Sequence, residues 1–328
     1  MGFNSFNGGI IGKTNNPSIA AASGVWSLAR QFLSRSNNLW PGQIITVEYL
    51  VVAGGGAGGN SPGMPGGGGA GGYRSSVTGE SSGGGALAET PLSILPGTSY
   101  TVTIGAGAPA PPAYQTGTRG SNSVFSVITS IGGGKGEDIV SNNPTDLTGG
   151  SGGGGAGYSG WTSGGSGTNN QGRAGGNGVS SNGGAGGGGG GAGAVGEHAI
   201  SSSPPFSAAY GGNGGAGISS SITGSAVTRS GGGGGPGNNW NGPGGAGGGG
   251  NGGYNSNGTS GEVNTGGGGG GNHGNGYVGK GGGSGIVILR YPSSYTITLS
   301  AGLTGTTSIV GANKVTTITA GTGTVSWS

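Results

Sequence analysis

The stretch Gly183-Gly-Ala-Gly-Gly-Gly-Gly-Gly-Gly-Ala-Gly-Ala194 decides the fold of this chain. Similar runs recur at 231–237, 242–253 and 266–276, and glycine occupies 97 of the 328 positions. Glycine loses more backbone entropy on ordering than any other residue, because no Cβ restricts its backbone. The runs are therefore either disordered or ordered by a packing that only glycine permits.

Two common glycine-rich templates fit poorly. Collagen needs glycine at every third position and about 15–20% proline or more, whereas Gly-Gly runs interrupt any triplet here and the chain has only 15 prolines. A flexible linker would scatter its apolar residues, but here they gather in islands at 44–53, 100–104, 123–128 and 285–291. Islands of Val, Ile, Leu and Tyr bounded by glycine predict buried strands.

The ordered alternative is polyglycine II, an extended threefold helix. Runs of about 7–12 residues, at ~3.1 Å per residue, would be roughly 20–37 Å long. Without Cβ atoms such helices can lie side by side, each donating its N–H groups to the carbonyls of its neighbours. We expect order rather than disorder. The predicted fold is mainly β with a polyglycine II bundle or sandwich, a short N-terminal helix and a small C-terminal β-meander.

Composition divides the chain into three predicted parts. Residues 1–42 form an attachment segment, residues 43–291 a glycine-rich domain whose strands flank the glycine body, and residues 292–328 a β-meander. Strict alternation predicts meander strands at 295–299 and 314–319, and 324–327 is a candidate third strand. A meander of this size buries little, so it should pack on the body or self-associate.

The attachment segment carries more apolar surface than a short helix can bury alone. Ser23 is a candidate cap for a helix over 24–34, and such a helix is too short to be stable alone in water. It therefore needs the body or a partner. The candidate attachment residues are Trp26, Leu28, Phe32 and Trp40.

The charge pattern excludes several functions. Charged residues make up 6% of the chain, the formal net charge is +3, and the 11 Lys and Arg residues are spread singly. No basic patch for nucleic acid results. No stretch of about 18 apolar residues exists, so insertion into a membrane is not expected.

The pattern gives catalysis little support. His198 and His273 lie far apart, and the adjacent acidic pair Glu137-Asp138 is interpreted as solvated loop residues. Gly12-Lys13-Thr14 resembles the end of a phosphate-binding loop but has no strand before it. We expect no enzyme activity, no metal and no cofactor.

Irregular polar and aromatic segments alternate with the glycine runs. Aromatic rings beside amides and hydroxyls can stack on sugars or contact proteins, although the same rings could instead cover the sides of the bundle. The candidate receptor-binding residues are Tyr158, Trp161, Phe206, Tyr210, Trp240, Asn241 and Tyr254.

Four motifs carry a family resemblance. They are Val47-Glu-Tyr-Leu-Val-Val-Ala-Gly-Gly-Gly56, Tyr100-Thr-Val-Thr-Ile-Gly-Ala-Gly107, Gly120-Ser-Asn-Ser-Val-Phe125 and Gly285-Ile-Val-Ile-Leu-Arg-Tyr291. They resemble the framework of glycine-rich domains common in marine bacteriophage structural proteins, and 22–41 resembles the lead-in often found before them. The likeness covers about residues 8–291. In architecture the body also resembles the polyglycine II tip adhesins of T-even phages.

The resemblance implies a phage tail-fibre or tail-tip protein that acts outside the cell as part of the virion. Its expected partners are other virion tail proteins and a host receptor, either a glycan or an outer-membrane protein. Many phage fibres are homotrimers, so a trimer is expected. One alternative is a purely structural fibre, spike or appendage subunit without its own receptor site. Another is an ice-binding protein, although these present flat repeated faces rather than irregular aromatic loops.

Overall fold

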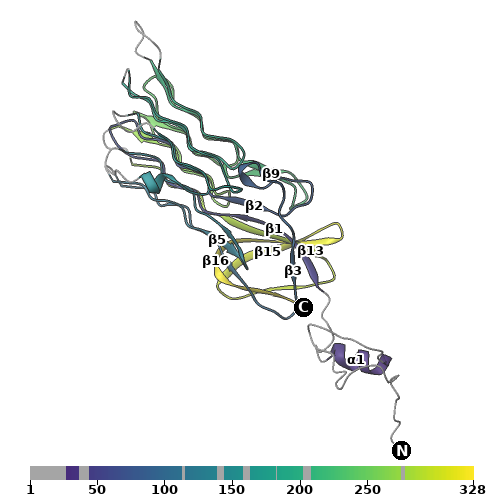
Figure 1. Ribbon diagram of the computed structural model, residues 1–328. Coiled ribbons are helices and arrows are strands. Elements are labelled where there is room, and N and C mark those ends of the chain that lie inside the picture. The colour runs from purple at the N-terminus through teal and green to yellow at the C-terminus, as the bar shows by residue number, and fades with distance from the viewer. Residues whose placement is uncertain are drawn as a thin grey trace, which may run out of the picture.

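The structure is a computed structural model that describes residues 27–36, 44–112, 115–138, 144–157, 163–181, 183–201, 208–274 and 278–328. The protein is mainly β, and a curved sheet leads into the long glycine-rich body (Figure 1). The elements in chain order are α1 (Leu28–Ser36), β1 (Ile45–Val52), β2 (Tyr73–Ser75), η1 (Gly83–Gly85), β3 (Leu92–Ile94), β4 (Tyr100–Thr103), β5 (Ser123–Phe125), β6 (Ile128–Ser130), η2 (Pro144–Leu147), β7 (Ile200–Ser201), β8 (Ala209–Tyr210), β9 (Ile218–Ser220), β10 (Val227–Arg229), β11 (Gly253–Tyr254), β12 (Asn272–His273), β13 (Ile286–Pro292), β14 (Ile297–Leu299), β15 (Leu303–Val310) and β16 (Asn313–Trp327).

The main sheet has ten strands and curls until it is almost a barrel. Its order is β2-β1-β13-β16-β4-β5-β6, with β3 on β1 and both β14 and β15 on β16. The pairings are antiparallel, as in Leu50 opposite Ile288. The predicted islands are the strands β1, β4, β5–β6 and β13, so this part of the sequence prediction is confirmed.

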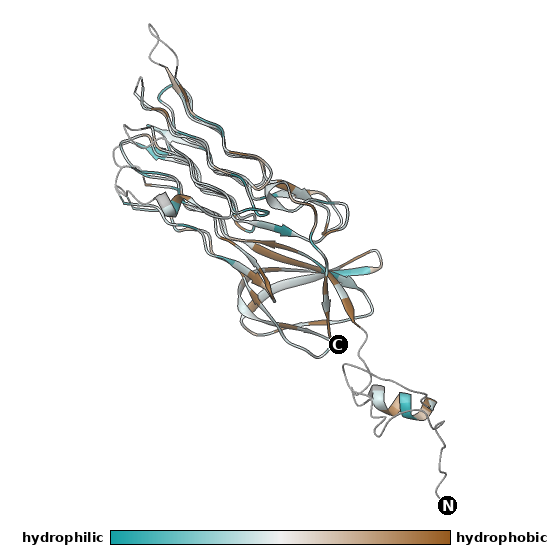
Figure 2. Ribbon diagram, viewed as in Figure 1, coloured by the Kyte–Doolittle hydropathy of each residue, from teal (hydrophilic) through white to brown (hydrophobic). Residues whose placement is uncertain are grey.

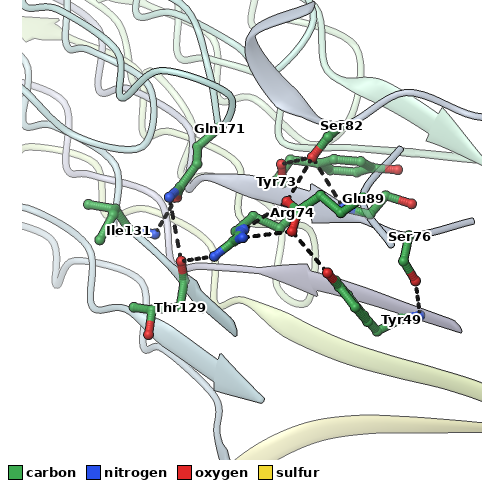
Figure 3. A network of polar contacts seen from close by, with 10 residues as sticks. Tyr49, Tyr73, Arg74, Ser76, Ser82, Glu89, Thr129, Ile131 and Gln171 are labelled. Carbon is green, nitrogen blue, oxygen red and sulfur yellow. Dashed lines mark hydrogen bonds and ion pairs between the residues drawn. The ribbon is translucent and has the colours of Figure 1, made fainter. Parts of the chain in front are cut away.

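A polar network joins the two ends of the curled sheet. On β2, Arg74 Nη1 donates to the carbonyl of Thr129 on β6 at 3.2 Å (Figure 3). The same guanidinium donates twice to Glu89, at 2.8 and 2.6 Å, and the Tyr49 hydroxyl donates to that carboxylate at 2.9 Å. Gln171 Nε2 also donates to the Thr129 carbonyl, at 3.4 Å. Side chains therefore bridge the gap between β2 and β6.

Hydrophobic residues concentrate in the sheet, along β1 and its neighbours (Figure 2). On one face Tyr49, Phe125 and Trp327 are buried within one cluster. On the other face Leu50 and Ile288 pack with Ile222, which lies between β9 and β10. Both faces of β1 are covered, which explains its nearly continuous apolar run.

The C-terminal residues belong to the same sheet. The predicted strands at 314–319 and 324–327 are one continuous strand, β16, which pairs with β13, β15, β4 and β14. The pattern did not predict β15, whose residues are too small and polar to alternate clearly. Trp327 is 1% exposed, and its ring lies 5.7 Å from that of Tyr291. The segment is thus stabilised by packing on the rest of the domain.

The glycine body is ordered by backbone hydrogen bonds with a period of three. Along 66–72, every third N–H group donates to the same neighbouring segment of the chain. Gly66, Gly69 and Gly72 donate to 131–137, Gly67 and Ala70 donate to 187–190, and Gly68 and Gly71 donate to 266–269. The central run 186–192 repeats the rule with three other neighbours, at 230–236, 152–155 and 194–197. A polyglycine II bundle requires this threefold division of its hydrogen bonds.

Close approach of the backbones excludes side chains from most of the body. A Cβ added at Gly189 would lie less than 3.0 Å from the carbonyl oxygen of Gly68, and one added at Gly55 would be equally close to that of Gly267. Real Cβ atoms essentially never come so near another atom. This explains why glycine is needed in these runs.

The N-terminal helix α1 lies apart from the sheet, at the end opposite the glycine body (Figure 1). It begins later than predicted, because the hydroxyl of Ser27 caps it by accepting the N–H of Arg30 at 3.3 Å. Ser23, Trp26 and Trp40 lie outside the described residues. In the part of the chain that the structure describes, no helix has the length and apolar character needed to cross a bilayer.

Candidate functional site

The candidate site is the far end of the glycine body, which we define as the end remote from the sheet. Residues 53–60 leave β1 and reach this end at Asn60, which forms a bridge with Asn272. Gly59 donates to Gly66 at 3.0 Å as the chain turns back. Each run thus delivers its connecting loop to one of the two ends of the body.

Two of the predicted aromatic residues meet at the far end. Tyr210 and Trp240 form a parallel bridge, and the N–H of Gly211 donates to the Trp240 carbonyl at 2.9 Å. The two residues are 40% and 64% exposed. Both backbones are fixed by the bundle while both rings face solvent.

Asparagines beside Trp240 hold its turn. The side-chain oxygen of Asn238 accepts the N–H of Ala209 at 2.8 Å, and that of Asn241 accepts the N–H of Gly237 at 3.2 Å. Asn239 donates its N–H to the Ala209 carbonyl at 3.1 Å. Asn241, predicted to bind a receptor, therefore uses its carbonyl oxygen to position Trp240.

Tyr254 belongs to a second aromatic pair at the same end. The N–H of Gly252 donates to the carbonyl of Gly242, so these two residues lie side by side in the body. Trp240 comes two residues before Gly242 and Tyr254 two residues after Gly252, so both lie where the chain leaves the body at the far end. The Tyr254 ring stacks on His273, with centroids 5.0 Å apart and planes 9° apart. Burial lowers the pKa of His273, although a hydrogen bond that the imidazole donates to the backbone of Ser61 opposes the shift. Burial thus favours the neutral form of the imidazole.

The sequence did not reveal the role of His273. Its partner is 19 positions away, and the pairing of β11 with β12 arises from the register of two glycine runs. No spacing rule of a helix or hairpin connects them. Tyr158, Trp161 and Phe206 lie outside the described residues, and the predictions made for them stay predictions.

The acidic pair Glu137-Asp138 was wrongly interpreted as solvated. Glu137 is 5% exposed and Asp138 is 1% exposed, and Lys135 Nζ lies 3.4 Å from an Asp138 carboxylate oxygen. Burial raises the pKa of Glu137 to about 7; Lys135 lowers it and Asp138 raises it further. The bundle buries these charges because the residues alternate with glycines that pack against neighbouring runs.

The predicted attachment residues that the structure describes are exposed. Leu28 is 86% and Phe32 is 73% exposed on α1. Among the described residues, no group of three or more His, Asp or Glu side chains could hold a metal ion.

A model of the glycine-rich domain family matches residues 34–292 of the chain. No curated protein matches the chain. The matched range begins within α1 and ends with β13, so it includes the entire glycine body. The chain therefore belongs to the glycine-rich domain family.

Proposed function

We propose that this protein is a bacteriophage tail-fibre or tail-tip protein that binds the host cell through the far end of its glycine body. The observation that carries the proposal is the exposed pair of Tyr210 and Trp240, held on a backbone fixed by hydrogen bonds. An exposed aromatic pair on a rigid support is the arrangement expected of a binding surface rather than of a core.

The chemistry of the far end suits an extended, partly polar ligand. Trp240 and Tyr210 offer ring faces for stacking on a sugar or for anchoring a protein loop. Their backbones are already ordered, so binding costs little additional conformational entropy. We propose a surface glycan or an outer-membrane protein as the receptor.

The opposite end of the molecule suits attachment to the virion. Leu28, Phe32 and Leu33 of α1 are all more than half exposed. A nine-residue helix with such a surface gains most of its stability by packing on a partner. We propose another virion tail protein as that partner, with the glycine body holding the receptor site away from the particle.

Alanine variants at Tyr210 and Trp240 test the proposal. Particles carrying Trp240→Ala should adsorb to host cells at least ~30-fold less well, as expected for loss of an anchor worth about 2 kcal/mol. Val127→Ala is the matched control, because Val127 is 78% exposed but lies in the β5–β6 turn of the sheet. Normal adsorption by both aromatic variants would contradict the proposal and favour a purely structural virion subunit.

A further inference from the structure

An open edge strand lies on the opposite side of β16 from β13. β15 pairs with β16 along its length, from Leu303 opposite Gly321 to Val310 opposite Asn313. Among the described residues, no other strand pairs with β15. Its six central residues, 304–309, are all exposed. β15 thus presents a free row of backbone donors and acceptors.

The strand lacks the usual protection of a sheet edge. Edge strands are commonly short or carry Lys, Pro or inward-facing charges that block further pairing. β15 has eight residues, contains neither proline nor a charged residue, and exposes Ile309 to 73%. Its one irregularity, a register shift between Thr304 and Gly305, leaves 305–310 regular.

The template behind this edge is fixed. Residues 313–318 of β16 pair with β13 on their other side, as in Thr317 opposite Ile288. The Thr307 hydroxyl lies 2.8 Å from that of Thr316, which in turn contacts the Tyr291 hydroxyl at 2.9 Å. An added strand would therefore meet an ordered edge and lose little entropy on the side of this chain.

We propose that β15 pairs with β15 of a second copy of this chain, in antiparallel orientation about a twofold axis. A twofold interface requires a surface that is complementary to itself. A strand with one sign of charge would repel its own copy, whereas 303–310 carries no charge at all. A centre near Thr307 places Thr and Ser opposite one another, and such cross-strand pairs are favourable.

The interface lies on the sheet and leaves the far end of the body uncovered. A dimer joined in this way would carry two far ends, both outside the interface. The dimerisation itself does not depend on the proposed host-binding function. It also differs from a trimer, which a twofold edge pairing cannot form.

The test is the mass of the full chain in solution, measured by sedimentation equilibrium over a range of concentrations. We expect a mass about twice the 30.3 kDa of the chain. The double variant Thr306→Lys/Ser308→Lys places lysines of both copies in the interface and should weaken dimerisation by at least about tenfold. Ser93→Lys is the control, an exposed strand position on β3 that should leave the mass unchanged.

If the double lysine variant fails to fold, a second measurement on the unaltered chain still tests the proposal. Hydrogen exchange of the unaltered chain should show that protection of amides in 306–309 increases with protein concentration. A monomer at every concentration would overturn the proposal. So would a trimer or a dimer whose mass the lysines leave unchanged, or exchange at 306–309 that is independent of concentration.

Discussion

Side-chain packing orders the sheet of this protein, whereas backbone contacts order its glycine body. In the sheet, large side chains such as Tyr49, Phe125 and Trp327 pack into one cluster on a face of the strands. In the body, backbones touch directly, and each run satisfies its hydrogen bonds with three neighbours. The sheet should therefore respond to lost volume, and the body to added volume.

This difference also means that the loops of the body can vary in sequence without lowering its stability. A glycine run makes its contacts through N–H, C=O and Cα–H groups, which are the same at every glycine. Its loops can then change without altering a side-chain core. In the sheet, by contrast, a change at one strand affects side chains from several others.

The largest expected effect is that of a side chain placed inside the body. Gly189→Val should destabilise the protein by about 5 kcal/mol or more, because the new Cβ would overlap the Gly68 carbonyl. Thermal and denaturant unfolding would measure it. Gly117→Ala is the control and should cost far less, because its new Cβ would meet the Ala57 Cβ at 3.1 Å, a tight contact that a shift of a few tenths of an ångström relieves. Nearly equal stability of Gly189→Val and the unaltered chain would contradict ordered packing of the runs.

Two tryptophans provide the next comparison. Trp327→Ala should cost about 3–5 kcal/mol, because the side chain is 1% exposed and packs with Tyr100 and Phe125. Trp240→Ala should change the free energy of unfolding by only about 0.5 kcal/mol, because its ring is 64% exposed. Denaturant titration of both variants would check this. Similar losses would mean that Trp240 packs the body and is not a binding residue.

The sequence predicted the sheet well because side-chain pattern determines it. The run Leu50–Val52 and the alternation of 100–104 are direct signs of burial on two faces and on one. β15 was missed because its exposed Thr, Ser and Gly residues have no buried face to mark it. Its strand structure comes from pairing with β16.

The candidate site was only partly predictable for a related reason. Aromatic residues between glycine runs stood out, and Tyr210 and Trp240 do lie together. The partnership of Tyr254 with His273 and the burial of Glu137 depend on which runs are neighbours. Glycine runs are nearly identical in sequence, so nothing in them specifies their neighbours before the bundle is formed.

The smallest expected effects are on the pH dependence of stability, for one carboxylate of the body and one of the sheet. The pKa of Glu137 is raised to about 7 by burial, so the folded state favours its protonated form. The contribution of Glu137 to the free energy of unfolding is therefore most favourable below pH 4.5, the ordinary pKa. It is lost as the pH rises through 7, and the loss is at most about 3 kcal/mol. Glu137→Gln should consequently raise the melting temperature at pH 8 relative to the unaltered chain, and should change it little near pH 4.

Glu48 on β1 should show the opposite dependence. Burial tends to raise its pKa, but Arg290, whose Nε donates to it at 2.6 Å, and the N–H of Thr78, which donates to it at 3.3 Å, together outweigh burial and hold the pKa below its usual value. Its stabilisation is present above the usual pKa and is lost as pH falls through the lowered one, and the pair is worth about 1 kcal/mol or less at this partial exposure. Glu48→Gln should therefore lower the melting temperature slightly at pH 8. If Glu137→Gln also lowers it there, the buried carboxylate is charged and held by Lys135, and the body tolerates charge as the sheet does.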